Sequence, residues 1–226
     1  EIYLRGFDAA HGQDVEIKVS DIPINQPSHI HGQGYADLNF VVPEVVRSLR
    51  VTEGIYSPTQ GDFAVAGSVA FDLGVERRGY QLKTAFGSFG TIRQVVVWAP
   101  EGEDAETFGA GQIRNTQGFG QNRGGLSGGG IGQYVVSLGP TTRMRWHAAA
   151  HGARAAMAGV LRREDVENGS VGFYESYADT SATSQSASSL RAQLGVTLER
   201  TAHDGSRSGF SLWAQDSTFR SRTNFT

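Results

Sequence analysis

The sequence predicts a mainly β protein, in which strands of an antiparallel transmembrane β-barrel follow a smaller N-terminal α+β unit. Three observations carry this prediction. Apolar and polar residues alternate along most segments after Gly74, which is the pattern of strands with one apolar face. The connections between these segments alternate along the chain between short turns and long polar loops. The composition changes at the stretch Pro43 to Leu73, which we interpret as the junction between the two parts.

Length and composition exclude several classes of protein. The 226 residues suffice for one large or two small domains, and 38% hydrophobic with 19% charged residues is typical of a folded chain. A net charge of −3 without a Lys/Arg cluster argues against a nucleic-acid partner. The sequence contains no Cys, which excludes disulfides, thiol catalysis and thiolate metal sites. The sequence has no run of about 18 apolar residues, so a membrane location requires a closed barrel.

The N-terminal part reads as short strands joined by loops. Val15 to Ser20 alternates as a half-buried strand does, and Pro43 occupies a favoured first position of a helical turn. Glu1 opens directly into a strand-like run and Thr226 falls within a strand, so we expect a fragment of a longer chain. The further elements expected here are the strands Ile2–Arg5, Ser48–Thr52 and Ser68–Leu73, and the extended segment Asp21–Asn25.

Seven strands are expected after Gly74. Alternation alone also permits a soluble β-sandwich, but long loops on one side and short turns on the other favour an outer-membrane barrel. The long connections are Gln117–Gly130 and Glu164–Ser189. Among the expected strands, the segment Ile92 to Trp98 differs from the others because it is apolar on both faces. Seven strands leave two bare edges, so we expect further strands elsewhere in the full protein. The predicted strands are 79–88, 91–99, 105–116, 131–138, 142–161, 189–200 and 208–219.

Four short blocks of sequence stand out in the first 73 residues. They are Leu4-Arg5-Gly6, Asp21-Ile22-Pro23-Ile24, Leu38 to Glu44, and Leu49 to Val69. Taken together, in their order and spacing, these blocks resemble the plug domain of TonB-dependent outer-membrane transporters. Three positions depart from that family's usual pattern: Ile22 stands in place of Gly, Ile55 in place of Pro after Gly54, and Gln60 in place of Tyr.

The resemblance implies a function. Residues 1–75 are then the C-terminal part of a plug domain, and residues 76–226 the first strands of the transmembrane β-barrel. The resemblance also implies that the protein imports a scarce, large solute, such as a ferric siderophore or cobalamin, across the outer membrane of a Gram-negative cell. Its partners are the TonB energy-coupling protein, which binds upstream of this fragment, the imported ligand and outer-membrane lipid. The alternative is a passive or structural barrel, porin-like or adhesin-like, with a constricting N-terminal insert.

The candidate ligand-binding residues lie on two loops that the resemblance places at the outward end of the plug. Polar and aromatic side chains on such loops can hydrogen-bond a polar solute. The spacing of the two histidines in the second loop is a weak metal-binding signal without an adjacent carboxylate, so we expect no metal site. The residues are His11 and Gln13 in the first loop, and Asn25, His29, His31 and Tyr35 in the second.

Charges near the junction are candidates for plug–barrel contacts. We expect Arg50 or Glu53 to meet an inward-facing barrel charge such as Lys83 or Arg93, with a pair inside the plug as the alternative. The candidates for lipid-facing aromatics are Trp146, Tyr134, Trp213 and Phe210. Trp213 shares parity with polar residues, so it could instead face the lumen or lie above the bilayer. No nucleophile–base pair or phosphate-binding loop is recognisable, so the sequence indicates neither an enzyme nor a bound cofactor.

Overall fold

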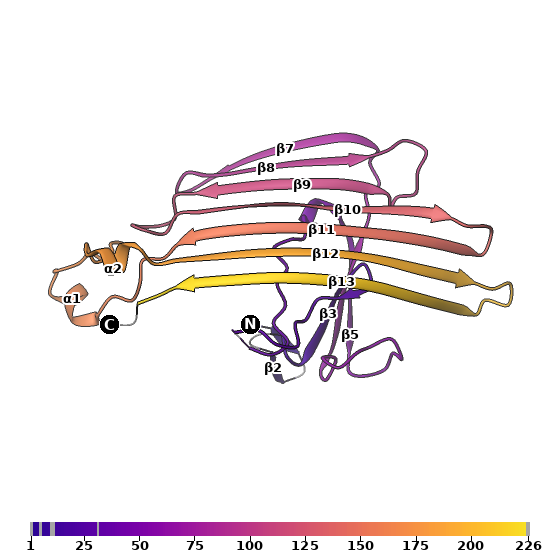
Figure 1. Ribbon diagram of the computed structural model, residues 1–226, viewed down its shortest axis with the longest axis horizontal. Coiled ribbons are helices and arrows are strands. Elements are labelled where there is room, and N and C mark those ends of the chain that lie inside the picture. Colours follow the sequence, from indigo (N-terminus) through magenta and orange to yellow (C-terminus); the bar gives the residue numbers. More distant parts are fainter. Residues whose placement is uncertain (1, 5, 10–11, 31, 225–226) are drawn as a thin grey trace.

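The computed structural model describes residues 2–4, 6–9, 12–30 and 32–224, and in it the protein is mainly β, as predicted. A seven-stranded antiparallel sheet with the order β13-β12-β11-β10-β9-β8-β7 runs along its whole length (Figure 1). The N-terminal unit lies against one face of this sheet, which we call the inner face. The seven strands are β7 (Gly79–Gly87), β8 (Thr91–Ala99), β9 (Phe108–Thr116), β10 (Gly125–Ser137), β11 (Thr142–Ala156), β12 (Ser186–Thr201) and β13 (Arg207–Arg222).

All seven predicted strands are present, but several of their boundaries were wrong. The Gly-rich run expected to belong to a long loop is the first half of β10, from Gly125. At Gly129 an added Cβ would lie 2.3 Å from the Ala150 carbonyl oxygen on β11. Glycine therefore serves here for close approach of two backbones, not for a turn. β11 also ends at Ala156, five residues before the predicted end.

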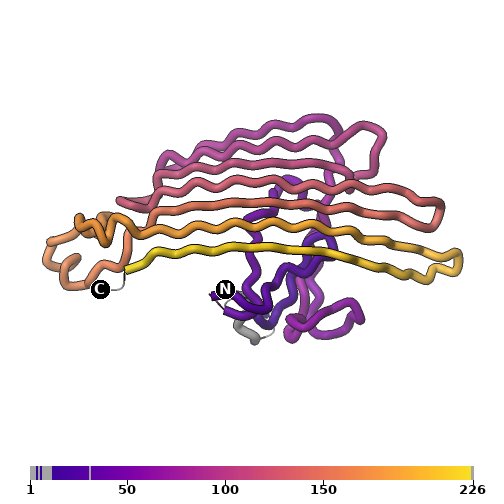
Figure 2. The backbone as a smooth tube through the Cα atoms, viewed as in Figure 1, coloured from indigo at the N-terminus to yellow at the C-terminus, as the bar shows by residue number. Residues whose placement is uncertain are grey.

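The connections at the two ends of the sheet differ in length, although the β7–β8 turn at the end with the longest loop is also short. Short turns join β8 to β9, β10 to β11 and β12 to β13 at one end, as the backbone trace shows (Figure 2). The longest loop lies at the opposite end and contains α1 (Arg163–Glu167) and α2 (Thr180–Thr183), two helical turns that the sequence did not signal. Neither of these helices has the length and apolar character to cross a membrane.

The N-terminal unit is built on a four-stranded sheet with the order β4-β3-β6-β5. β3 pairs in parallel with β6 and antiparallel with β4, and its residues on both faces are buried except for the half-buried Lys18. The half-buried strand predicted there was wrong, because Glu16 is only 3% exposed. The strands are β1 (Ile2–Leu4), β2 (Phe7–Ala9), β3 (Val15–Val19), β4 (Ile22–Pro23), β5 (Val46–Glu53) and β6 (Gly67–Leu73), and the 3-10 turn η1 spans Pro43–Val45.

One apolar core joins the N-terminal unit to the inner face of the large sheet. Phe40, Val42 and Val45 pack in the same buried cluster as Val95 and Val97 of β8. This contact explains why Ile92 to Trp98 is apolar on both faces, since one face meets the core and the other faces outward. Burial of apolar area supplies the non-directional part of the attraction between the two units.

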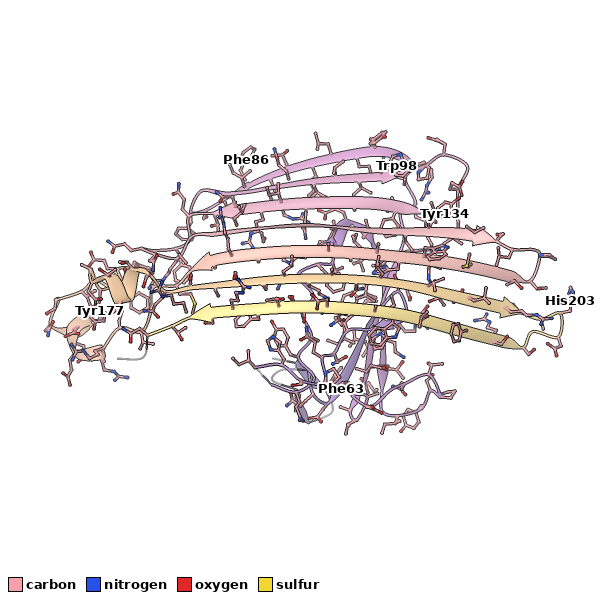
Figure 3. The ribbon with its side chains drawn as sticks, viewed as in Figure 1. Phe63, Phe86, Trp98, Tyr134, Tyr177 and His203 are labelled. Atoms are coloured by element: carbon pink, nitrogen blue, oxygen red, sulfur yellow. The ribbon has the colours of Figure 1, made fainter. Side chains whose placement is uncertain are left out.

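The outer face carries most of the large aromatic side chains. Trp146 and Tyr134 are directly opposite each other across β10 and β11, and each is 50% exposed. Trp98 and Tyr134 lie near the short-turn end of the sheet, and Phe86 lies on β7 (Figure 3). Trp213 differs, because its cross-strand partner is Gly195, which faces the N-terminal unit. Of the two orientations considered for Trp213, the inner one is therefore observed.

Candidate functional site

The candidate site is the polar part of the boundary between the N-terminal unit and the inner face. At one position Glu44, in η1, accepts two hydrogen bonds from Arg93 of β8, Nη1 to Oε1 at 2.7 Å and Nη2 to Oε2 at 2.8 Å. Lys83 of β7 donates to the same carboxylate at 2.9 Å. These bonds, from Arg93 above all, lower the pKa of Glu44 to about 2, against the opposing effect of burial.

A second group of charges lies nearer the short-turn end. Arg145 of β11 binds Asp21 of the N-terminal unit and donates to Glu106 at 2.9 Å. Arg143 also binds Glu106, and its Nε lies 3.1 Å from Glu199 of β12. The two arginines thus face three carboxylates, of which only Asp21 comes from the N-terminal unit. In this group, the Arg145–Asp21 pair therefore joins the N-terminal unit to the wall.

Open space adjoins this second group. A cavity of about 660 Å³ lies between β5 and the inner face, with both arginines of the group in its lining. A neighbouring cavity of about 440 Å³ shares Asp21, Arg50 and Glu199 with it. The apolar core meets the sheet at β8 to β11, and the wall residues that line the cavities belong mainly to β10 to β13. The boundary is therefore packed on one side and polar and open on the other.

The predicted plug–barrel ion pair takes a different form. Arg50 binds Asp72 on the neighbouring strand of its own sheet, with Nη2 at 2.9 Å from Oδ1, so its ion pair is the alternative inside the N-terminal unit. Glu53 ends β5 and takes no part in the ion pairs of the described residues. Lys83 and Arg93 do meet the N-terminal unit, as expected of the wall residues, but their partner is Glu44.

The two loops proposed for ligand contact are tied together. Asn25, which is buried, accepts a hydrogen bond from the Ile17 N–H at 2.7 Å and donates to the carbonyl oxygens of Gly12 and Gly34 at 3.0 and 3.1 Å. Its amide is thereby used to join the first loop to the second. The Gln13 backbone packs so closely on Gly34 that an added Cβ there would lie 2.6 Å from the Gln13 Cα.

Aromatic stacking orders the second loop. The rings of His29 and Tyr35 are stacked, with centroids 4.2 Å apart and planes 10° apart, and Phe219 of β13 lies 5.7 Å from His29. Burial and the nearby Asp37 carboxylate raise the pKa of the Tyr35 hydroxyl. The Tyr35 phenol is therefore neutral at physiological pH and can donate a hydrogen bond.

Two candidate residues, His11 and His31, lie outside the described residues. Of the two-histidine pattern in the second loop, only His29 is thus placed. Within the described ranges, no three His, Asp or Glu side chains come together in the manner of a metal site.

Sequence reasoning missed the buried polar residues of the wall. Arg191 of β12 is 3% exposed and its Cζ lies 4.6 Å from the centre of the Phe40 ring. The Nε2 of His147 is 2.8 Å from the amide nitrogen of Gln193, and both side chains are buried. The signal was present, since these residues occupy the polar positions of alternating strands. Which of those positions would meet the N-terminal unit depends on the docking, which alternation does not encode.

Comparison with known proteins supports the fold. No protein-family model matches the sequence, and no curated protein matches it. Among solved structures, the unliganded ferric citrate transporter FecA gives a TM-score of 0.65 at 13% identity, covering 96% of this chain and 33% of that chain. The FpvAI–pyocin S2 complex gives 0.61 at 12% identity (88% and 26%), and the copper transporter OprC gives 0.61 at 14% (89% and 29%).

These neighbours are TonB-dependent receptors, so the fold that the resemblance predicted is confirmed. At identities of 12–14% the likeness concerns the fold alone. The chain spans about a quarter to a third of the length of each structure, 26–33%.

Proposed function

We propose that this chain, which has the fold of TonB-dependent receptors, is the plug and first barrel strands of an active importer. In this proposal residues 1–75 are the plug and residues 76–226 the start of the barrel. The full protein takes up a scarce, large solute, such as a ferric siderophore or cobalamin, across the outer membrane of a Gram-negative cell. Energy comes from the TonB protein, whose contact region lies upstream of this chain.

The observation that carries this proposal is the docking of the N-terminal unit on the inner face. A passive channel needs an open lumen, whereas here Phe40 and Val42 pack against the β8 wall and Glu44 binds it with two hydrogen bonds. A unit held in this way blocks passage until it moves. Transport through such a barrel therefore requires a conformational step, and this proposal assigns its energy source to TonB.

The outer face supports a membrane location. Large apolar side chains alternate with inward polar ones, as in Trp146 beside Arg145 and His147. Aromatic residues occur toward both ends of this face, with Phe86 toward one end and Trp98 and Tyr134 toward the other (Figure 3). This arrangement fits the two interfacial belts of an outer-membrane barrel.

The ligand, in this proposal, meets the outward surface formed by the two tied loops and the nearby wall. Gln13, His29 and Tyr35 are the described candidates for direct contact, with His11 and His31 as further candidates. Asn25 contributes by holding the loops together, since its amide is already used by backbone groups. This surface binds and does not catalyse, so we propose no enzymatic reaction.

The test is uptake by the full-length protein, arranged so that the solute need not be chosen in advance. Gram-negative cells with and without a functional TonB protein would express it in the organism's own spent medium. Mass spectrometry would then identify solutes depleted relative to empty-vector cells. We expect depletion of at least one large solute only in cells with TonB. Equal depletion in both strains would support the passive barrel instead.

A further inference from the structure

The outer face of the seven-stranded sheet is hollowed near the short-turn end. Residues that are directly opposite each other on neighbouring strands project from the same face. One such row on the outer face begins with Trp98 on β8 and ends with Leu194 on β12, and the three residues between them are small. They are Gly109, Gly132 and Ala148. The surface is therefore low between two large, exposed side chains.

The two adjacent rows give this hollow the shape of a groove. Toward the short turns, Tyr134 and Trp146 are opposite each other and close one end. In the other direction, Gly130 and Ala150 continue the small floor toward the middle of the strands. A mainly apolar cavity of about 450 Å³ lies in the hollow, and Trp98 and Tyr134 in its wall can be followed in Figure 3. This volume is within the range of about 300–1,000 Å³ that is typical of ligand sites.

The rim of the groove carries charges of both signs, on and against the connection between β8 and β9. Glu103 lines the cavity, and its carboxylate takes part in no hydrogen bond or ion pair of the described residues. Arg78 donates to the carbonyl oxygens of Asp104 and Thr107, at 3.2 Å each, and Thr107 also lines the cavity. The Arg78 guanidinium has no carboxylate partner in the part of the chain that the structure describes. One unpaired negative charge and one unpaired positive charge thus adjoin an apolar groove.

We infer that this groove binds one glycerophospholipid whose headgroup carries an amine, such as phosphatidylethanolamine. An acyl chain lies over Gly132 and Ala148, and the headgroup ammonium is next to Glu103. The headgroup phosphate, which is negatively charged, lies on the Arg78 side. Because the short turns of an outer-membrane barrel face the periplasm, the lipid belongs to the periplasmic leaflet. This inference rests on the membrane location in the proposed function and is independent of import.

Two physical effects distinguish this lipid from the lipids around it. Within a bilayer, a chain that fills the hollow gains dispersion contacts that a smooth wall does not offer. The headgroup then decides which lipid is held, because Glu103 attracts an ammonium, and the attraction is stronger beside lipid than in bulk water. A phosphatidylglycerol with the same chains has the phosphate but no ammonium, so it leaves Glu103 without a partner.

The test is native mass spectrometry of the purified full-length protein, released from detergent micelles that contain equal amounts of phosphatidylethanolamine and phosphatidylglycerol with identical chains. Ala148→Leu fills the groove, and Ala214→Leu is its matched control, because Ala214 is opposite Leu194 on the same outer row but outside the cavity. Glu103→Gln removes the rim charge, and Glu101→Gln, on the same connection but outside the lining, is its control. The melting temperature of each variant verifies folding.

We expect wild type to retain one phosphatidylethanolamine in preference to phosphatidylglycerol. Glu103→Gln should lower this preference about threefold, roughly the contribution of an exposed ion pair, and Ala148→Leu should lose the retained lipid. Both controls should behave as wild type does. Equal retention of the two lipids by wild type, or an unchanged result for either variant, would overturn the inference. A protein dimer in place of the lipid, abolished by Ala148→Leu, would assign the groove to a second copy and also overturn it.

The outcome is separable from that of the uptake experiment. TonB-dependent uptake by a protein without the lipid preference would reject the inference alone. A retained phosphatidylethanolamine in a protein without TonB-dependent uptake would support the inference and reject the proposed import alone.

Discussion

Glu44 of the N-terminal unit and Arg93 of the wall form a bidentate ion pair, with hydrogen bonds of 2.7 and 2.8 Å. A planar guanidinium matches a carboxylate in this way, and the geometry fixes the relative orientation of the two units. Lys83 binds the same carboxylate from the neighbouring strand. The Glu44 side chain therefore binds two neighbouring strands of the wall, β7 and β8.

Replacing Glu44 by Gln should weaken this docking. The amide offers one oxygen where two cations are now bound, so Arg93 and Lys83 lose most of their compensation. We expect the free energy of unfolding to fall by about 1–3 kcal/mol, the cost typical of a lost charged hydrogen bond. Thermal melting of the full-length protein measures this. Glu53→Gln, at the exposed end of β5, is the control, and an equal effect of the two substitutions would contradict the assigned role.

The same ion pair predicts a pH dependence. The pKa of Glu44 is lowered from 4.5 to about 2 in the folded protein. A lowered carboxyl pKa stabilises the fold fully above the unfolded value, and this stabilisation is lost as pH falls through the folded value. The difference in melting temperature between wild type and Glu44→Gln should hold above about pH 4.5 and shrink toward pH 2. A difference that grows on acidification would contradict this assignment.

Close packing at Gly195 predicts a steric effect on docking. A Cβ at this position of β12 would lie 2.4 Å from the Cδ1 atom of Ile22, which is 2% exposed. Gly195→Val should therefore push the N-terminal unit from the wall, at a cost of about 1–3 kcal/mol. Limited proteolysis of the N-terminal unit in the full-length protein reports the separation. Gly209→Val is the control, because its nearest neighbour, the Leu198 carbonyl oxygen, is 3.6 Å away; the idea fails if both variants are cleaved alike.

The two faces of the sheet predict which tryptophans meet lipid. The sequence contains three, and Trp98 and Trp146 are on the outer face whereas Trp213 has inner parity. The test uses full-length variants in which two of these three tryptophans are replaced by Phe. Brominated lipids should quench the fluorescence of the variants that keep Trp98 or Trp146, and should not quench that of the variant that keeps Trp213. Strong quenching of Trp213 would show that the faces are assigned the wrong way round.

The sequence predicted the strands well because alternation is a local pattern. β8 was predicted with its observed limits, and β7 to within one residue. The first half of β10 was missed because a run of glycines is typical of loops. Its reason for being a strand is the backbone of β11 beside Gly129, a contact that no local pattern reveals.

The site was harder to predict than the strands. Lys83 and Arg93 were identified as wall charges that meet the N-terminal unit, yet the choice between the carboxylates of Glu44 and Glu53 as their partner depends on how the two units dock. Asn25 was predicted as a ligand contact, and its hydrogen bonds to both loops became visible only with the fold. Side-chain partners across a domain boundary are non-local, and composition carries little information about them.

The central claim is that the N-terminal unit closes the lumen and must separate from the inner face during import. The Ser20 hydroxyl, in the N-terminal unit, donates to Gln133 Oε1 of β10 at 2.6 Å, so cysteines introduced at these two positions can be joined by a reducible cross-linker. Ser48 and Asp72, whose side chains are 2.8 Å apart within the N-terminal unit, provide the matched control pair. This chain has no native cysteine to interfere.

The deciding measurement is the rate of TonB-dependent solute uptake by the cross-linked full-length protein before and after reduction. For the double variant Ser20→Cys, Gln133→Cys, the account predicts uptake near background while the two introduced thiols are joined, and recovery on reduction. The control pair should transport at the wild-type rate in both states. Undiminished uptake through the protein tethered between the N-terminal unit and β10 would contradict the claim.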